Sequence, residues 1–184
     1  KNKADEVFSQ YDLDIIENNT GKTLTKQQMI DLCSDVDGVI VGLDSMDEEV
    51  LRSARKLKAI SKYGVGLDNI DLKVAEELGI KVRIAEGTNT RSVAELTIAL
   101  FFALSRSIPK STFDVKDGKW DRTIGAELLG KTVGIIGFGA IGREVAKMSA
   151  GLGMKIKAYD PYFNDVALAK AMNVKMTSID NILR

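Results

Sequence analysis

The clearest pattern of apolar and polar positions in the chain runs from Thr132 to Asp160. A short apolar run ending at Ile136 predicts a strand, and apolar residues then recur at helical spacing as far as Gly153. The helical positions are Ile141, Val145, Met148 and Leu152. A second short strand is predicted from Ile156 to Tyr159. This part of the chain therefore has the order strand, helix, strand.

Strands and helices also alternate along the preceding residues. The predicted elements are a helix over 1–10, a strand over 13–16, a helix over 26–33 capped by Thr25, a strand over 39–43, a helix over 46–56, a strand over 57–61, a helix from the cap Asp71 to Leu78, and a strand over 80–84. The continuous apolar run Val39–Leu43 is typical of a strand covered on both faces. Such alternation predicts a parallel sheet wrapped by helices, an α/β fold.

The segment Ser92–Leu104 differs, because it is apolar on nearly every side of a helix. We expect it to be buried between domains or between subunits. A second helix is predicted from Pro109 to Asp117, and residues 125–130 form a loop before the Thr132 strand. After Asp160 the pattern predicts a helix over 166–171 and a strand over 174–176.

Glycines at Gly137, Gly139 and Gly142 have the spacing G-x-G-x-x-G between the predicted strand and helix. In a dinucleotide-binding unit the first glycine permits the tight turn, the second lets the backbone approach the pyrophosphate, and the third lets the helix pack closely. The motif alone is weak, because glycine turns without a ligand are common. Here it is followed by a second strand and by Asp160, an acid about 20 residues further on.

Asp160 is expected to accept hydrogen bonds from the adenosine ribose hydroxyls. Its carboxylate would repel a 2′-phosphate, so NAD is favoured over NADP as the cofactor. The alternative is that Asp160 only caps the helix that follows Pro161, and both roles could coexist.

The composition limits the partners and the kinds of chemistry that are expected of these residues. The 184 residues carry 26 basic and 26 acidic side chains, which gives no electrostatic reason to expect nucleic acid or an anionic membrane as a partner. A single cysteine, Cys33, fits a cytoplasmic location. The chain has no histidine, so histidine acid–base chemistry and a Cys/His metal site are not expected from these residues.

Four stretches together resemble the D-isomer-specific 2-hydroxyacid dehydrogenase family. They are LKAISKYGVGLDNIDL at 57–72, NTRSVAELTIAL at 89–100, KDGKW at 116–120 and the segment 128–161. Four matches in the same order are far more specific than one glycine motif. The resemblance covers about residues 36–184.

The resemblance implies two doubly wound parallel-sheet domains, with the active site in the cleft between them. Residues 1–90 would be a flavodoxin-like substrate-binding domain that lacks its first strand. Residues 91–184 would be the first half of a Rossmann NAD-binding domain. The chain would thus be a piece of a longer protein. The helix from Ser92 would resemble the family's dimer-forming element, giving a homodimer or a higher oligomer, and a purely internal core helix is the alternative.

The resemblance also implies the roles of individual residues. The substrate carboxylate would lie in the loop Lys62, Tyr63, Gly64, Val65 and Gly66, where successive backbone N–H groups can form an anion nest, with Asn89 as a further polar contact. The alternative for this loop is a plain strand-to-helix turn with a surface lysine. The cofactor would lie against Gly137, Phe138, Gly139, Ala140, Ile141, Gly142, Asp160 and Ala85.

Two departures from the family pattern are visible. Ala85 stands where the family usually has a threonine whose hydroxyl touches the cofactor, and Glu86 introduces an acid near the cleft. The family's catalytic arginine, glutamate and histidine correspond to positions beyond Arg184. No catalytic residue is therefore assigned within this chain, and we expect these residues alone to be inactive and to bind NAD weakly.

The resemblance implies hydride transfer between a 2-hydroxy acid and NAD. The motifs are most similar to the branch that oxidises 3-phosphoglycerate in serine biosynthesis. Reduction of glyoxylate, hydroxypyruvate or D-lactate is the alternative within the family. A protein of another class, which keeps the fold to sense NAD and recruit a partner as corepressor-like relatives do, is a further alternative.

Overall fold

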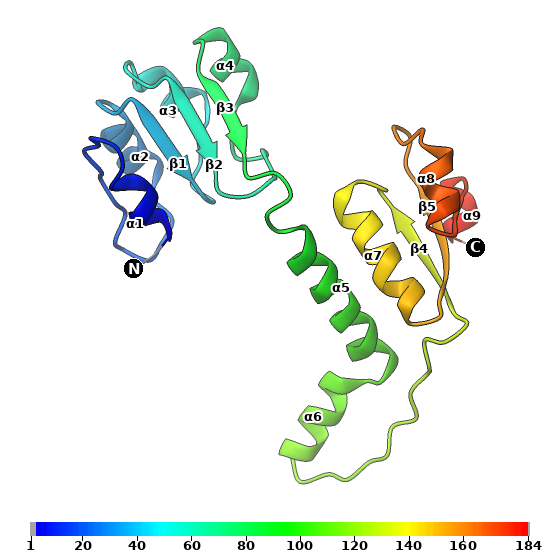
Figure 1. Cartoon of the computed structure of the whole chain (residues 1–184). Coiled ribbons are helices and arrows are strands. Elements are labelled where there is room, and N and C mark those ends of the chain that lie inside the picture. The colour runs from blue at the N-terminus through cyan, green and yellow to red at the C-terminus, as the bar shows by residue number, and fades with distance from the viewer. Residues whose placement is uncertain (1–2, 184) are drawn as a thin grey trace. The chain divides into compact units, whose positions relative to one another are not determined.

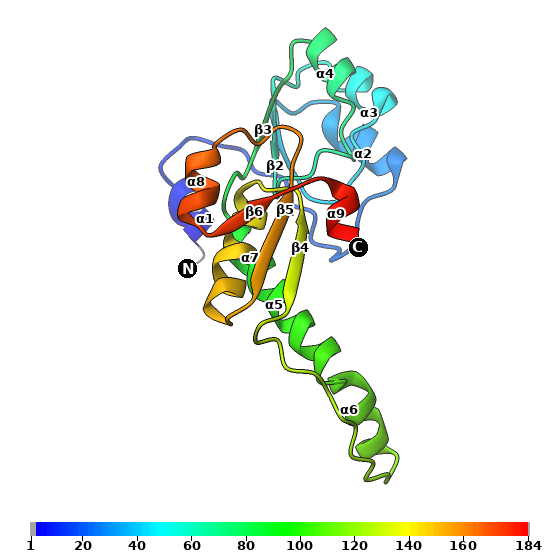
Figure 2. The same cartoon turned by 90° about the vertical axis from the view of Figure 1, so that its right-hand side faces the viewer.

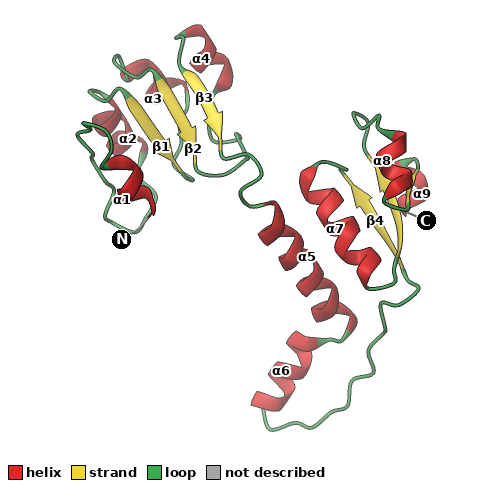
Figure 3. Ribbon diagram, in the orientation of Figure 1, coloured by secondary structure: helices red, strands yellow, loops and turns green. Residues whose placement is uncertain are grey.

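Helices and strands alternate along residues 3–183, the part of the chain that this computed structural model describes (Figures 1 and 3). A division between Ala85 and Glu86 separates two units, called unit 1 (residues 1–85) and unit 2 (residues 86–184) below. Each unit holds a parallel sheet with three strands among the described residues. The predicted α/β fold class with two parallel sheets is confirmed.

Unit 1 follows the helices and strands expected from the hydrophobic pattern, apart from its first strand. Its elements are α1 (Lys3–Phe8), α2 (Lys26–Cys33), β1 (Gly38–Val41), α3 (Glu48–Ser53), β2 (Ala59–Lys62), α4 (Leu72–Glu77) and β3 (Lys81–Ile84). The strand order is β1-β2-β3, with Val39 opposite Ile60 and Ile60 opposite Val82.

Side-chain caps fix the start of three helices in unit 1. Thr25 accepts from the Gln28 N–H while the Gln28 side chain accepts from the Thr25 N–H, which is a capping box at α2. Asp47 caps α3 by accepting from Val50, and Asp71 caps α4 by accepting from Val74. The cap at Asp47 places the start of α3 at Glu48, later than the expected start at Met46.

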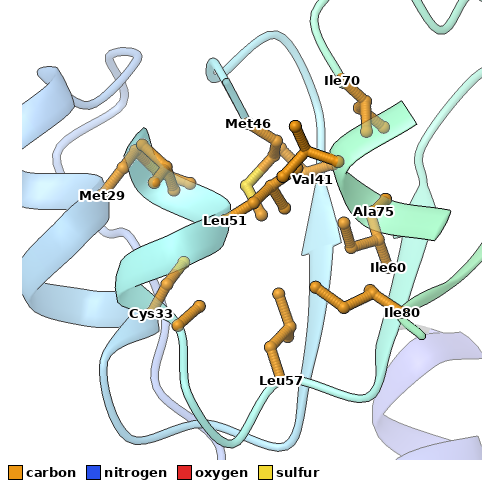
Figure 4. Packing of buried hydrophobic residues seen from close by; sticks show 13 residues of the cluster. Met29, Cys33, Val41, Met46, Leu51, Leu57, Ile60, Ile70, Ala75 and Ile80 are labelled. Carbon is orange, nitrogen blue, oxygen red and sulfur yellow. The ribbon is translucent and has the colours of Figure 1, made fainter. Parts of the chain in front are cut away.

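The core of unit 1 lies on one face of its sheet. The side chains of Met29, Cys33 and Leu51 reach from α2 and α3 toward the strands, where they meet Val41 and Ile60 (Figure 4). The helices α2, α3 and α4 contribute buried side chains to this core and cover this face.

The expectation that β1 is covered on both faces is wrong. Ile40, which points to the opposite face of the sheet from Val41, is 61% exposed. A side chain on a strand alternates between the two faces, so helices on one face leave every second residue open.

The predicted strand over Leu13–Ile16 is also wrong. These residues form no regular element, and Leu13, Ile15 and Ile16 are each about half exposed or more. A strand exists only when its backbone groups pair with a neighbour, and no strand of the described chain pairs with this segment.

Unit 2 begins with two helices and continues as a parallel sheet with flanking helices (Figure 2). Its elements are α5 (Thr90–Ser105), α6 (Ile108–Lys116), β4 (Thr132–Ile136), α7 (Ala140–Gly151), β5 (Lys155–Tyr159), α8 (Val166–Ala171), β6 (Val174–Met176) and α9 (Ile179–Leu183). The strand order is β4-β5-β6. The helix α9 was not expected from the sequence.

Different helices pack on the two faces of the unit 2 sheet, α7 on one and α9 on the other. Val133 and Ile135 of β4 pack in one cluster with Val145 of α7, and α7 in turn packs along α5. On the other face α9 lies so close to β4 that a Cβ on Gly134 would stand 2.4 Å from the Ile182 Cγ2. Glycine at 134 thus permits this approach.

The helix α5 is not buried within the described chain. Ala94 is fully buried, but Leu96, Leu100 and Leu104 are 61%, 53% and 79% exposed. These leucines recur every four residues and form one apolar row along the helix, called the leucine row below. The side of α5 that faces α7 is covered, whereas the leucine row is exposed.

No single helix among residues 3–183 is both long and apolar enough to cross a membrane. The helices α5 and α6 satisfy that test only when taken together, and they are bent by 62° at their junction.

Candidate functional site

The glycine motif forms the turn between β4 and α7. Gly137 has a φ of +94°, a backbone conformation that glycine adopts without the steric cost of a Cβ. Gly142 lies directly against this turn, because a Cβ there would stand 2.1 Å from the Gly137 carbonyl oxygen. By contrast, a Cβ on Gly139 would meet nothing within 4 Å. The turn therefore packs tightly against α7 at Gly142, whereas there is free space beside Gly139.

The first turn of α7 has free hydrogen-bonding capacity. Gly139 is the N-cap residue and offers no side chain to cap the helix. The first backbone N–H groups of a helix have no partner within the helix, and they carry the positive end of its dipole. Ala140 and Ile141 are the first two residues of α7. Their position fits a diphosphate group.

Asp160 follows β5 and connects two segments of the chain. Its Oδ2 accepts from the Phe138 N–H at 2.7 Å, and its Oδ1 accepts from the Tyr162 N–H at 2.8 Å. These backbone donors, together with Phe163, hold the pKa of the Asp160 carboxyl below its usual range. The carboxylate is thus charged at neutral pH, and it has acceptor capacity left for a further donor.

Asp160 is not a helix cap. The cap of α8 is Asp165, whose side chain accepts from the Leu168 N–H at 2.9 Å. The alternative role for Asp160 considered from the sequence is therefore wrong.

The loop after β2 in unit 1 contains a buried lysine. Lys62 is only 6% exposed, and its ammonium donates to the Asn69 Oδ1 at 2.7 Å and to the Gly42 carbonyl oxygen. It forms no ion pair within residues 3–183. The alternative of a surface lysine is wrong, since this lysine points beneath the loop.

Asn69 connects the loops that follow β1 and β2. Its Nδ2 donates to the carbonyl oxygen of Asp44 at 2.6 Å and to that of Gly42 at 3.2 Å, while its Oδ1 accepts from Lys62. The amide therefore uses both of its ends within unit 1. Nothing in the hydrophobic pattern indicated this role.

The backbone of the Lys62–Gly66 loop is partly committed to the fold. The Tyr63 N–H donates to the Val41 carbonyl oxygen at 2.9 Å, and the Gly64 carbonyl oxygen accepts from Ala85 at 3.0 Å. The Tyr63 side chain is 82% exposed. In the described structure the N–H groups of Gly64, Val65 and Gly66 have no protein acceptor, so they are the donors left for an anion.

Ala85 and Asn89 lie on either side of the division between the units. Ala85 follows β3 in unit 1, and its N–H donates to Gly64, so it connects β3 to the Lys62–Gly66 loop. Asn89 precedes α5 in unit 2 without capping it through its side chain. The Asn89 Oδ1 is buried and has no hydrogen-bond partner in the described structure.

The predicted site residues thus form two groups. In unit 2 the structure brings Gly137, Phe138, Gly139, Gly142 and Asp160 together, with Ala140 and Ile141 at the start of the adjacent helix. In unit 1 it brings the Lys62–Gly66 loop and Ala85 together. Asn89 lies in unit 2. No cluster of acidic, Cys and His side chains able to hold a metal occurs in residues 3–183.

The features of the two units define a class of protein. Unit 2 has a strand–glycine turn–helix–strand arrangement with an acid at the end of its second strand, which is the geometry of a dinucleotide-binding α/β protein. Unit 1 is a separate parallel α/β unit.

Comparison with known families then gives the particular family. The family described as D-isomer specific 2-hydroxyacid dehydrogenase, catalytic domain, matches residues 1–184. The chain belongs to this family of oxidoreductases. The resemblance recognised from the sequence motifs is confirmed.

Individual relatives have different activities in their names. The chain is 43% identical over 145 residues to a hydroxypyruvate reductase from Thermotoga maritima, covering 77% of this chain and 47% of the relative. It is 42% identical over 162 residues to a D-3-phosphoglycerate dehydrogenase from Methanocaldococcus jannaschii, covering 86% of this chain and 30% of the relative. The chain therefore spans less than half the length of these two relatives.

Among solved structures, an NAD-dependent formate dehydrogenase from Staphylococcus aureus in complex with NAD is similar to this chain. The TM-score is 0.74 and the identity 29%, and the match covers 86% of this chain and 49% of that one.

Proposed function

We propose that the protein to which this chain belongs is an NAD-dependent dehydrogenase of D-2-hydroxy acids that acts on D-3-phosphoglycerate. The observation that carries the proposal is the glycine turn of unit 2, where Asp160 holds the turn and Gly139 leaves it open. The residues of this turn fit a dinucleotide. The similarity to a D-3-phosphoglycerate dehydrogenase over 86% of the chain supports the substrate.

The preference for NAD follows from the charge of Asp160. Its pKa is held low by backbone N–H donors, so the carboxylate is ionised wherever the protein is folded near neutral pH. An ionised carboxylate can accept a hydrogen bond from the adenosine ribose and repels a 2′-phosphate. No basic side chain that could neutralise it forms an ion pair with Asp160 in the described structure.

The Lys62–Gly66 loop is proposed to bind the substrate carboxylate. A buried charge is normally paired, yet Lys62 has only a carbonyl and an amide oxygen as partners. Its stem passes beneath the loop, since a Cβ on Gly64 would lie 3.8 Å from the Lys62 Cε. The uncompensated charge and the free N–H groups of Gly64, Val65 and Gly66 would together favour an anion above the loop.

Each group would have a distinct part in the reaction. When bound, NAD would supply the hydride acceptor, or NADH the hydride donor, for carbon 2 of the acid. The amides at Gly139, Ala140 and Ile141 would hold the cofactor diphosphate, and Asp160 would hold its adenosine ribose. The Lys62–Gly66 loop would orient the substrate carboxylate, and Asn89 would supply a polar contact. The residue that exchanges the hydroxyl proton is not assigned to this chain.

Reduction of hydroxypyruvate is a second candidate activity. The identity to a hydroxypyruvate reductase, 43%, is as high as that to the phosphoglycerate dehydrogenase. Both substrates carry a carboxylate next to the reacting carbon 2, which is an alcohol in D-3-phosphoglycerate and a ketone in hydroxypyruvate, and only the former carries a phosphate on carbon 3. The described loop contacts are proposed for the shared carboxylate alone.

The test begins with the cofactor. Isothermal titration of the protein with NAD and with NADP should give the tighter binding for NAD, and D160S should reduce that preference at least tenfold. Equal affinity for both cofactors in the unmodified protein would contradict the assignment of Asp160.

The substrate is tested on the whole protein by following NADH absorbance. With NAD, D-3-phosphoglycerate should be oxidised faster than D-lactate at equal concentration. With NADH, the rates of reduction of hydroxypyruvate and glyoxylate decide the second candidate. An NAD-binding protein without turnover on any of these acids would favour the sensing alternative.

We further propose that the leucine row of α5 lies in a homodimer contact. Three leucines between 53% and 79% exposed on one helix form an apolar surface that a partner would cover.

A further inference from the structure

Phe138, the residue between the first two motif glycines, is held by three separate contacts. Its N–H donates to Asp160 at 2.7 Å, and its carbonyl oxygen accepts from the Arg143 guanidinium at 3.1 Å. Its ring is fully buried and makes an edge-to-face contact with Phe163, with ring centroids 4.9 Å apart. Phe138 is therefore held at both of its backbone groups and at its side chain.

The contact from Arg143 determines how the next peptide group points. In a trans peptide the C=O and the following N–H point in opposite directions. A Phe138 carbonyl oxygen fixed toward Arg143 therefore directs the Gly139 N–H to the other side. Gly139 has open space around it, so this N–H is one of those available to a diphosphate.

No ion pair of Arg143 accounts for its hydrogen bond to Phe138 in the described structure. Arg143 is half buried in the first turns of α7 and takes part in no ion pair in residues 3–183, so its hydrogen bond to Phe138 is not a by-product of pairing with an acid. A hydrogen bond from a charged donor is stronger than one between neutral groups.

We propose that Arg143 is a positioning residue for the cofactor. With Asp160 on the other side of Phe138, it sets the orientation of the peptide groups in the glycine turn before the cofactor arrives. This inference rests on the proposed dinucleotide function of unit 2, and it assigns to Arg143 a role that no glycine of the motif can supply.

The test compares three single variants in the protein that binds NAD. R143M keeps an unbranched stem that can pack like that of arginine but loses the guanidinium donor, while R143K keeps a charged donor. K147M is the matched control, because Lys147 lies one turn further along the same helix, is exposed, and forms no hydrogen bond or ion pair within residues 3–183. Dissociation constants for NAD are measured by calorimetry, and 15N relaxation of Phe138 and Gly139 is measured without ligand.

R143M should weaken NAD binding about tenfold, which corresponds to ~1.4 kcal/mol and lies just below the value of a charged hydrogen bond. R143K should regain most of that affinity, and K147M should change it less than twofold. In the free protein, R143M should increase the fast motion of Phe138 and Gly139 while β4 and β5 stay unchanged. A purely structural role would loosen the strands as well.

Two results would overturn the inference. One is an R143M variant whose NAD affinity and turn mobility match the unmodified protein. The other is an equal loss in R143M and K147M, which would assign the effect to charge alone. If the unmodified protein binds no NAD, the proposed function fails, and the relaxation measurement still decides whether Arg143 holds the turn.

Discussion

Replacing Gly142 by alanine tests the close packing on which the glycine turn depends. The added Cβ would stand 2.1 Å from the Gly137 carbonyl oxygen and 3.2 Å from both the Gly137 carbonyl carbon and the Ile135 Cγ2. An unstrained contact between carbon and oxygen is about 3.3 Å. The helix and the turn would therefore have to separate by about 1 Å, and the main obstacle is backbone, which cannot rotate away.

The cost can be bounded from two opposing terms. Overpacking a well-packed site costs about 1–3 kcal/mol, and a backbone obstacle belongs at the upper end of that range. Alanine in place of glycine in a helix returns about 1 kcal/mol. The expected net destabilisation of unit 2 by G142A is therefore about 2 kcal/mol.

Hydrogen exchange measured by mass spectrometry suits this chain, because it reports each unit separately. Peptides from β4 and β5 should exchange about 30-fold faster in G142A, which is the factor that ~2 kcal/mol implies. Peptides from β1 and β2 in unit 1 are the internal reference and should not change.

The matched control is G151A in the same helix. A Cβ on Gly151 would meet nothing within 4 Å, so alanine there should leave exchange unchanged or slow it by up to about fivefold. If G142A behaved like G151A, α7 would not pack as closely on the turn as described. The role of Gly142 in permitting that packing would then be wrong.

Three further predictions concern other parts of unit 2. S149A should leave unit 2 equally stable or stabilise it by about 1 kcal/mol, because the fully buried Ser149 hydroxyl has no partner in the described structure; a clear loss of stability in the same exchange assay would contradict this. The folded-state pKa of Asp160 lies below its unfolded value, so its stabilising effect is fully present above about pH 4 and is lost as the pH falls through the folded pKa. D160N should therefore reduce the loss of unit 2 stability in acid, and an acid unfolding curve identical to that of the unmodified protein would argue against the role. L100K should weaken self-association at least tenfold in sedimentation experiments, whereas V166K, a matched change at an exposed valine of α8, should not; dimers of equal strength in both variants would exclude the leucine row as the contact.

The sequence predicted best where the signals were local. Thr25 followed three residues later by Gln28 fixes the start of α2, and a helix cap acts within one turn. The helix over 166–171 and the strand over 174–176 were also predicted with their observed bounds. The helix α9 was missed because its five residues are too few to show a helical period.

The failures concern contacts between distant parts of the chain. Leu13–Ile16 has the apolar character of a strand, but only a neighbouring strand could satisfy its backbone, and no local pattern reports whether one is present. The exposure of Ile40 has the same origin, since it depends on which helices cover which face of the sheet.

By itself the sequence determined the family, the alternation of strands and helices, and the positions of Gly137, Gly139, Gly142 and Asp160. These depend on spacing and residue type, which are properties of a short stretch of chain. Only the tertiary structure decided that Lys62 is buried and held by Asn69, and that Arg143 and Asp160 hold Phe138 from opposite ends. Those contacts join residues of different elements. A hydrogen bond depends on the distance and direction between its atoms, and only the folded chain sets these.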